Sequence, residues 1–184
     1  MAARSGMTTI ISQWRDMVGA VGTATISDDR AQQILDDHRF DFWQDALTVT
    51  PLQVAAGSVV YKIYSSPYNN LEGTASGTVA YRLYDSNGTA VTPDTLDMQR
   101  GVFRFNADQS GSARYLDGRS FDLNGAAATG WRDLAGQYSG YYDFQQEGRR
   151  FSRSQWFDHC QQMARSFDAQ RTAIQVPIER GDFA

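Results

Sequence analysis

The sequence predicts an α+β protein, in which a small helical bundle carries an inserted antiparallel β module. Near both ends of the chain, apolar residues recur every three or four positions, which is the period of a helix. Between residues 48 and 116 the period changes to two, as in strands with one buried face. The 184 residues suffice for one ordinary domain, or for a core domain with one inserted module.

Two helices are predicted in residues 1–47, the N-terminal part of the bundle. The first spans residues 8–20 and ends at glycines 19 and 22; its apolar face comprises Ile10, Trp14, Met17 and Val21. The second follows Ser27, an N-cap residue, and has acidic residues in its first turn. Its apolar stripe is expected to contain Ala31, Ile34, Leu35, His38 and Phe42.

The inserted module, residues 48–116, is predicted to be one antiparallel sheet of four or five strands. Strands are expected at residues 59–64 and 79–85, and a further pair at 101–105 and 113–116. Asn87-Gly88 predicts a type I′ hairpin turn that joins residues 81–85 to 90–92. Residues 66–73 are rich in turn formers and are predicted to be an exposed loop.

Two further helices are predicted in residues 117–171, after a break at Asp117-Gly118. Glycines at positions 125, 130, 136 and 140 each cost about 1 kcal/mol relative to alanine in a helix, so close packing against another helix is expected. The stripe of this helix comprises Leu123, Ala127, Trp131, Leu134, Tyr138 and Tyr141. The last helix opens with a capping-box pattern at residues 152–155 and has the stripe Trp156, Cys160, Met163 and Phe167. Residues 172–184 are predicted to be an extended C-terminal tail.

No motif in the sequence predicts a catalytic, cofactor or metal site, so no enzyme activity is expected. His159 and Cys160 are adjacent, and consecutive helix residues point about 100° apart, so Cys160 should pack in the stripe and His159 on its flank. His38 follows two aspartates, but no second ligand has metal-site spacing; a histidine that complements the helix dipole is the favoured interpretation. No phosphate-binding glycine motif is present.

Composition narrows the classes of partner. The net charge of −4 disfavours general nucleic-acid binding. Lys62 is the only lysine among 17 basic residues; arginine suits protein interfaces, although a GC-rich coding sequence explains the bias equally well. One cysteine excludes an intrachain disulfide, and no apolar run is long enough for a membrane span or a signal peptide. We expect a cytosolic product without membrane contact.

The tyrosines of the β module are the candidate binding residues. Tyr61 and Tyr81 are in phase with aliphatic residues and are predicted to be core. Tyr64 and Tyr84 share the opposite face with Lys62 and Arg82, and that face is expected to contact either a sugar or a neighbouring protein subunit.

Several segments resemble the head–tail connector (adaptor, neck) proteins of tailed bacteriophages and prophages. The similarity covers most of the chain but contains no chemical signature. The segments are residues 26–38, 64–72, Gly101-Val-Phe-Arg-Phe105, residues 115–128 leading into Trp131, and Phe151-Ser-Arg-Ser-Gln-Trp156.

The resemblance implies a virion structural protein, made in the host cytoplasm, that forms a ring, commonly dodecameric, between the portal and the tail. The expected partners are other copies of the chain, the portal protein and a tail or stopper protein, with DNA passing through the lumen without specific binding. The alternative is a carbohydrate- or host-receptor-binding β module of a phage tail. The interface candidates are Tyr64, Tyr68, Asn70, Arg82, Tyr84, Arg149, Arg150, Arg153, Trp156, Ile174, Val176, Ile178 and Phe183.

Overall fold

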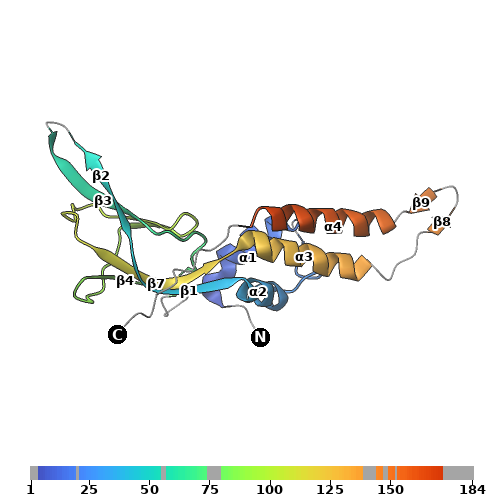
Figure 1. Ribbon diagram of the computed structural model, residues 1–184. Coiled ribbons are helices and arrows are strands. Elements are labelled where there is room, and N and C mark those ends of the chain that lie inside the picture. The colour runs from blue at the N-terminus through green and yellow to red at the C-terminus, as the bar shows by residue number, and fades with distance from the viewer. Residues whose placement is uncertain are drawn as a thin grey trace, which may run out of the picture.

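The computed structural model describes residues 4–19, 21–54, 57–73, 80–138, 144–146, 149–151 and 153–171. It confirms the α+β class: the described part contains four α-helices and two antiparallel sheets of three and four strands. The helices occupy one half of an elongated molecule and the two sheets occupy the other half (Figure 1). Each half has its own cluster of buried apolar side chains.

The helical half is organised around α3 (Leu123–Tyr138), which packs against all three other α-helices. These are α1 (Thr8–Met17), preceded by the short 3-10 helix η1 (Ser5–Met7), α2 (Asp28–Asp37) and α4 (Arg153–Ala169). Three consecutive alanines of α3, Ala126 to Ala128, are fully buried. Their small side chains allow the neighbouring helices to approach closely.

The ends of the first two helices follow local sequence signals. Gly19 adopts a φ of +85° just after α1, where left-handed backbone favours glycine. The hydroxyl of Ser27 accepts a hydrogen bond from the backbone N–H of Arg30 at 3.2 Å, as predicted for an N-cap. The prediction that the helical stripe reaches Phe42 is wrong, because α2 ends at Asp37 and residues 39–46 form a strand.

One sheet has the strand order β1-β7-β4 and the other has the order β2-β3-β6-β5, with every pair antiparallel. The first sheet contains β1 (Arg39–Ala46), β7 (Arg114–Phe121) and β4 (Arg82–Asp85). The second contains β2 (Thr48–Gln53), β3 (Val59–Ser65), β6 (Val102–Arg104) and β5 (Thr95–Asp97). A separate short hairpin consists of β8 (Phe144–Gln146) and β9 (Arg149–Phe151).

The predicted single sheet is therefore wrong. Residues 102–104 pair with β3 and β5, whereas residues 114–116 open β7 in the other sheet. The break expected at Asp117-Gly118 lies inside β7. Gly118 serves packing there rather than a turn, since a Cβ at this position would lie 3.1 Å from Cζ of Phe42.

The hairpin at Asn87-Gly88 forms, but not with the predicted turn type. The Asp85 N–H donates to the Thr89 carbonyl oxygen at 3.0 Å. Residues 90–92 do not form the expected strand, and only an isolated β-bridge joins Tyr84 to Ala90. Of the two turn residues only Gly88 has a positive φ, +78°, which excludes type I′. The Asp85 carboxylate accepts from two N–H groups of the turn, each at 2.9 Å, and so stabilises it.

Residues 66–73 contain no regular structure, as predicted, but the segment is not the exposed loop that was expected. Leu71 and Glu72 are buried. The Leu71 N–H donates to the carbonyl oxygen of Met98 and the Glu72 N–H to that of Arg119, both at 2.9 Å. Met98 lies between β5 and β6 of the four-stranded sheet, and Arg119 lies in β7 of the three-stranded sheet. The segment therefore connects the two sheets.

The last helix is confirmed, with one change in its stripe. Cys160 is buried and His159 lies exposed on the flank, as predicted. Trp156, expected to open the stripe, is 56% exposed, and Phe157 packs against the helical core instead. The capping residue Ser152 lies outside the described residues, as do Gly140, Tyr141 and the predicted tail.

The expected close packing at the α3 glycines is confirmed at Gly130, where a Cβ would lie 2.6 Å from Cζ2 of Trp14. We expect Gly130→Ala to destabilise the protein by about 1–3 kcal/mol through overpacking, in spite of the better helix propensity of alanine. Gly136→Ala is the matched control, because a Cβ there meets nothing within 4 Å and should stabilise by up to about 1 kcal/mol. Urea unfolding of both variants measures the difference, and equal effects would contradict the packing argument.

Candidate interaction surface

The three-stranded sheet has two unlike faces because side chains alternate along each strand. Phe42, Leu83 and Leu116 point into the apolar core of the sheet half. Residues between them in the strands point the other way, as the pairs Arg82–Asp117 and Tyr84–Tyr115 indicate. We define the outer face of this sheet as Trp43, Arg82, Tyr84, Tyr115, Asp117 and Arg119.

Asp117, in the central strand β7, accepts hydrogen bonds from both neighbouring strands on the outer face. One oxygen, Oδ1, accepts hydrogen bonds from the backbone N–H of Gln44 at 2.7 Å and from the hydroxyl of Tyr84 at 2.8 Å. Burial raises the pKa of Tyr84 to about 12, with a further contribution from its bond to Asp117. The hydroxyl therefore remains a donor at neutral pH, and the two strands that flank β7 are connected through a single carboxylate.

Trp43 is 75% exposed and lies on a β-bulge of β1. The pairing register with β7 shifts between Phe42 and Asp45, and Gln44 takes a φ of +56°, a left-handed conformation that is uncommon for residues other than glycine. The bond from Gln44 to Asp117 stabilises this conformation. The strained backbone thus presents a large indole to solvent from a fixed position.

Aromatic and arginine side chains continue the outer face. The rings of Tyr84 and Tyr115 stack with centroids 5.9 Å apart, and the Arg82 guanidinium lies 4.8 Å from the centroid of the Tyr84 ring. Tryptophan, tyrosine and arginine are the residues most enriched at the energetic centres of protein interfaces. The outer face therefore has the composition of a protein-binding surface.

A second aromatic group, which we call the helix-end cluster, combines Trp131 of α3 with Trp156 and His159 of α4. The His159 ring lies between the two indoles, 5.7 Å from Trp131 and 5.8 Å from Trp156 between centroids, both edge-to-face. Trp131 is buried and its indole N–H donates to the Met17 carbonyl oxygen at 3.2 Å, which anchors the cluster to α1. Trp156 is exposed.

The predicted tyrosine face is only partly correct. Arg82 and Tyr84 lie on the outer face, although Tyr84 is buried by its neighbours there. Tyr64 is fully buried and its hydroxyl donates to the carbonyl oxygen of Ser112 at 2.9 Å, so it is a core residue and not an interface residue. Tyr61 and Tyr81, predicted to be core, are half-buried. Of the two tyrosines on which the sugar-binding alternative rests, Tyr64 lies in the core and Tyr84 lies on the outer face.

The remaining candidates lie elsewhere. Tyr68 stacks on Phe42 with centroids 4.3 Å apart, and the Asn70 side chain donates to the Phe121 carbonyl oxygen at 3.4 Å; both are half-buried structural residues. The other candidates lie outside the part of the chain that the structure describes. For Arg149, Arg150 and Arg153 this concerns the side chains, and for Ile174, Val176, Ile178 and Phe183 it concerns the whole residues. The exposure of Trp43 could not be predicted from the sequence, because the bulge that carries this residue depends on the pairing of β1 with β7.

His38 has a structural role in the described part of the chain, where no three metal-ligating side chains gather. Its Nε2 lies 2.9 Å from the Thr129 hydroxyl, which donates to the Gly125 carbonyl oxygen, so the ring is the donor. Burial, together with the charge of Arg171, lowers the pKa of His38. The interpretation of His38 as a charge that complements the helix dipole is therefore not supported, because a lowered pKa favours the neutral ring.

The lowered pKa of His38 predicts a pH dependence of stability. The folded protein binds a proton at His38 more weakly than the unfolded chain, whose histidines titrate near pH 6.5. The folded state is therefore favoured while the His38 imidazole is neutral, above about pH 6.5, and the free energy of unfolding decreases as the pH falls below that value. Urea unfolding at pH 7.5 and pH 5.5 should show a larger loss for the wild type than for His38→Gln. Equal losses would show that His38 is not responsible.

Asp117 is expected to be the most sensitive residue of the outer face. Asp117→Ala leaves the Gln44 N–H and the Tyr84 hydroxyl without their acceptor and should cost about 2–3 kcal/mol. Tyr84→Phe removes only one of these bonds and should cost about 1 kcal/mol. Chemical denaturation compares the two variants. If Asp117→Ala is no more harmful than Tyr84→Phe, the bond to Gln44 does not stabilise the bulge.

Comparisons with known proteins identify no relative. No family model matches the chain, and neither the curated proteins nor the solved structures include a significant match. Among the helices that the structure describes, none has the length and apolar character of a membrane span.

Proposed function

We propose that the chain is a virion structural protein, a head-to-tail connector subunit that forms a ring between the portal and the tail of a tailed phage. The segments that resemble this family include much of the framework described above. Residues 26–38 form the N-cap and body of α2, and residues 115–128 run from β7 into α3. The resemblance therefore concerns the parts that determine the fold.

The observation that carries the proposal is the presence of two unlike surfaces on one chain, each with an exposed tryptophan. They belong to different halves of the molecule, and Figure 1 shows the sheet half and the helical half at opposite ends. The outer face, with Trp43, belongs to the sheet half, and the helix-end cluster, with Trp156, belongs to the helical half. In a ring, each subunit uses one surface toward one neighbour and a different surface toward the other. A single self-complementary surface would favour a two-fold dimer instead.

The other contacts of the proposed subunit are assigned by the resemblance. The C-terminal segment would contact the portal, a tail or stopper protein would bind the opposite side of the ring, and DNA would pass through the lumen. The net charge of −4 suits a channel wall to which DNA does not adhere. Synthesis in the host cytoplasm followed by incorporation into the virion neck completes the proposal.

The proposal is tested with the full chain and the portal protein encoded in the same genome. Negative-stain images and native mass spectrometry of the mixture should show a ring of the chain on the portal. Trp43→Ala and Trp156→Ala should each reduce ring assembly by at least about tenfold, because a buried tryptophan anchor typically contributes 2 kcal/mol or more. Val59→Ala is the control, since Val59 is an exposed apolar residue, 44% accessible, that belongs to neither aromatic surface.

Two results would overturn the proposal. One is the absence of any ring in the presence of the portal. The other is normal ring assembly by both tryptophan variants, which would remove the observation that carries it. Circular dichroism of each variant ensures that lost assembly does not reflect lost folding.

A further inference from the structure

The strand β1 has one open edge. In the described part of the chain β1 pairs only with β7, and it is the outermost strand in the order β1-β7-β4. An edge strand presents unpaired N–H and C=O groups, which proteins usually cover or protect. Residues 39–42 pair with β7 in regular register before the bulge of β1 begins. A further strand can add to β1 along this short segment.

The backbone groups of Asp41 point to this open edge. In an antiparallel pair, a residue directs its N–H and C=O to the same side of its strand, and the side alternates from one residue to the next. Arg119 of β7 lies opposite Asp41, yet its carbonyl oxygen accepts from the Glu72 N–H at 2.9 Å, on the side of β7 away from β1. Arg119 therefore does not bond to Asp41, whose own N–H and C=O face outward.

The backbone groups of Arg39 point the same way. The Asp122 N–H donates to the carbonyl oxygen of His38 at 3.0 Å, which extends the contact with β7 by one position. His38 thus bonds toward β7, and the alternation turns the N–H and C=O of the next residue, Arg39, to the open edge. Both contacts lead to the same result: residues 39 and 41 carry the outward-facing hydrogen-bonding groups.

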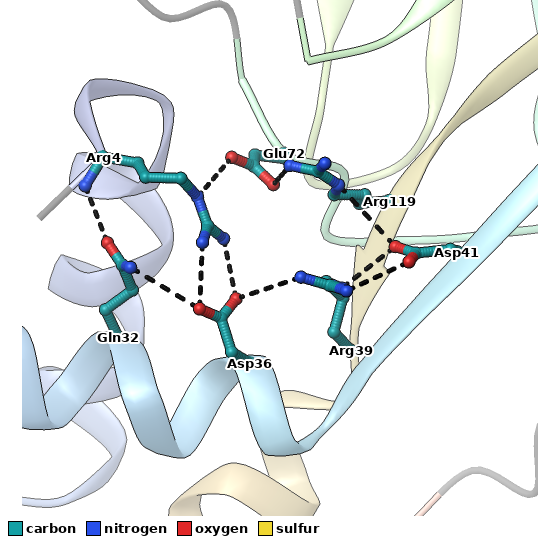
Figure 2. A network of polar contacts seen from close by, with 7 residues as sticks. All are labelled: Arg4, Gln32, Asp36, Arg39, Asp41, Glu72 and Arg119. Carbon is teal, nitrogen blue, oxygen red and sulfur yellow. Dashed lines mark hydrogen bonds and ion pairs between the residues drawn. The ribbon is translucent and has the colours of Figure 1, made fainter.

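The side chains along this edge alternate between charged and apolar. Arg39 and Asp41 are exposed, and Nε of Arg39 lies 3.0 Å from Oδ1 of Asp41 (Figure 2). Phe40, between them, is half-buried on the opposite side and packs against the core of the sheet half. An antiparallel second copy presents the same two charges in reverse order. The edge is therefore complementary in charge to a second copy of itself.

Only one antiparallel register of two copies satisfies this pattern. With Phe40 opposite Phe40 of the second copy, each Arg39 lies opposite an Asp41. A shift by one residue would join the apolar side of one copy to the charged side of the other. A shift by two residues would place either Arg39 opposite Arg39 or Asp41 opposite Asp41, and like charges directly opposite each other are destabilising.

We propose that two copies of the chain pair through the open edges of their β1 strands, antiparallel, with Phe40 at the two-fold axis. Each opposed Arg39 and Asp41 then exchange two backbone hydrogen bonds, because their N–H and C=O groups face the edge. The two Phe40 residues form the closer, non-hydrogen-bonded pair, in which the Cα atoms approach to about 4.5 Å. Each ring then covers part of the other.

The inference concerns the free chain, before any ring assembles, and goes beyond the connector role. The ring is proposed to use side chains of the outer face and of the helix-end cluster, whereas this pairing uses the backbone edge of β1. The regular part of the edge is short, and small interfaces give weak complexes. We therefore expect a dissociation constant of about 10–100 µM.

Sedimentation velocity of the full chain over a range of concentrations tests the pairing. Arg39→Asp places two aspartates opposite each other, and Asp41→Arg places two arginines opposite each other. Each variant alone should dimerise at least about tenfold more weakly than the wild type. An equimolar mixture of the two variants should dimerise again, because the arginines of one variant then face the aspartates of the other. A variant that merely misfolds is not rescued in this way.

Arg100→Asp is the matched control. It makes the same charge change at an exposed residue between β5 and β6, outside β1. Dimerisation of this variant should stay within about twofold of the wild type, since exposed charges that are far from the contact are screened by salt.

Any of three results would contradict the pairing. The first is a wild type that stays monomeric about tenfold above the expected dissociation constant. The second is a dimer that persists in both single variants, which would place the contact elsewhere. The third is a mixture of the two variants that remains monomeric. None of these measurements involves the portal, so the connector proposal can fail or stand separately.

Discussion

A buried carboxylate, that of Glu72, joins the helical half to the sheet half (Figure 2). It accepts a hydrogen bond from Nε of Arg4 at 3.1 Å and from a terminal nitrogen of Arg119 at 3.3 Å. Arg4 also forms a two-point ion pair with Asp36 of α2, at 2.9 and 2.7 Å. An unpaired carboxylate buried in this position would destabilise the fold, so Glu72 depends on both guanidinium groups. Through these contacts Arg4, which precedes η1, is fixed relative to α2 and to β7.

This fixed relation gives the two exposed aromatic surfaces a defined separation. The outer face depends on β7, which contains Arg119 and Asp117, and the helix-end cluster is anchored to α1 through Trp131. A subunit that contacts two different neighbours needs such a constraint, since mobile halves would add an entropic cost to every contact. The constraint is compatible with the proposed ring and does not depend on it.

Sequence patterns predicted well those features that are determined by residues close in the chain. The Ser27 cap, the end of α1 at Gly19 and the reversal at Gly88 each depend on a few neighbouring residues. The errors concern long-range pairing. Residues 39–46 continue an apolar helical pattern as far as Phe42, yet they form a strand because β7, roughly seventy to eighty residues further along the chain, offers a partner.

The α+β class, the capped ends of the first two helices and the close packing expected at the glycines of α3, found at Gly130, could be predicted from the sequence. The core position of Tyr64, the exposure of Trp43 on a bulge and the burial of Glu72 between two arginines could not, and they became apparent only in the folded chain. The physical reason is that caps, turns and helical periods are properties of local backbone geometry, whereas burial and bulges arise from which distant strand lies alongside. The candidate surface therefore became visible only when β1, β7 and β4 were brought together.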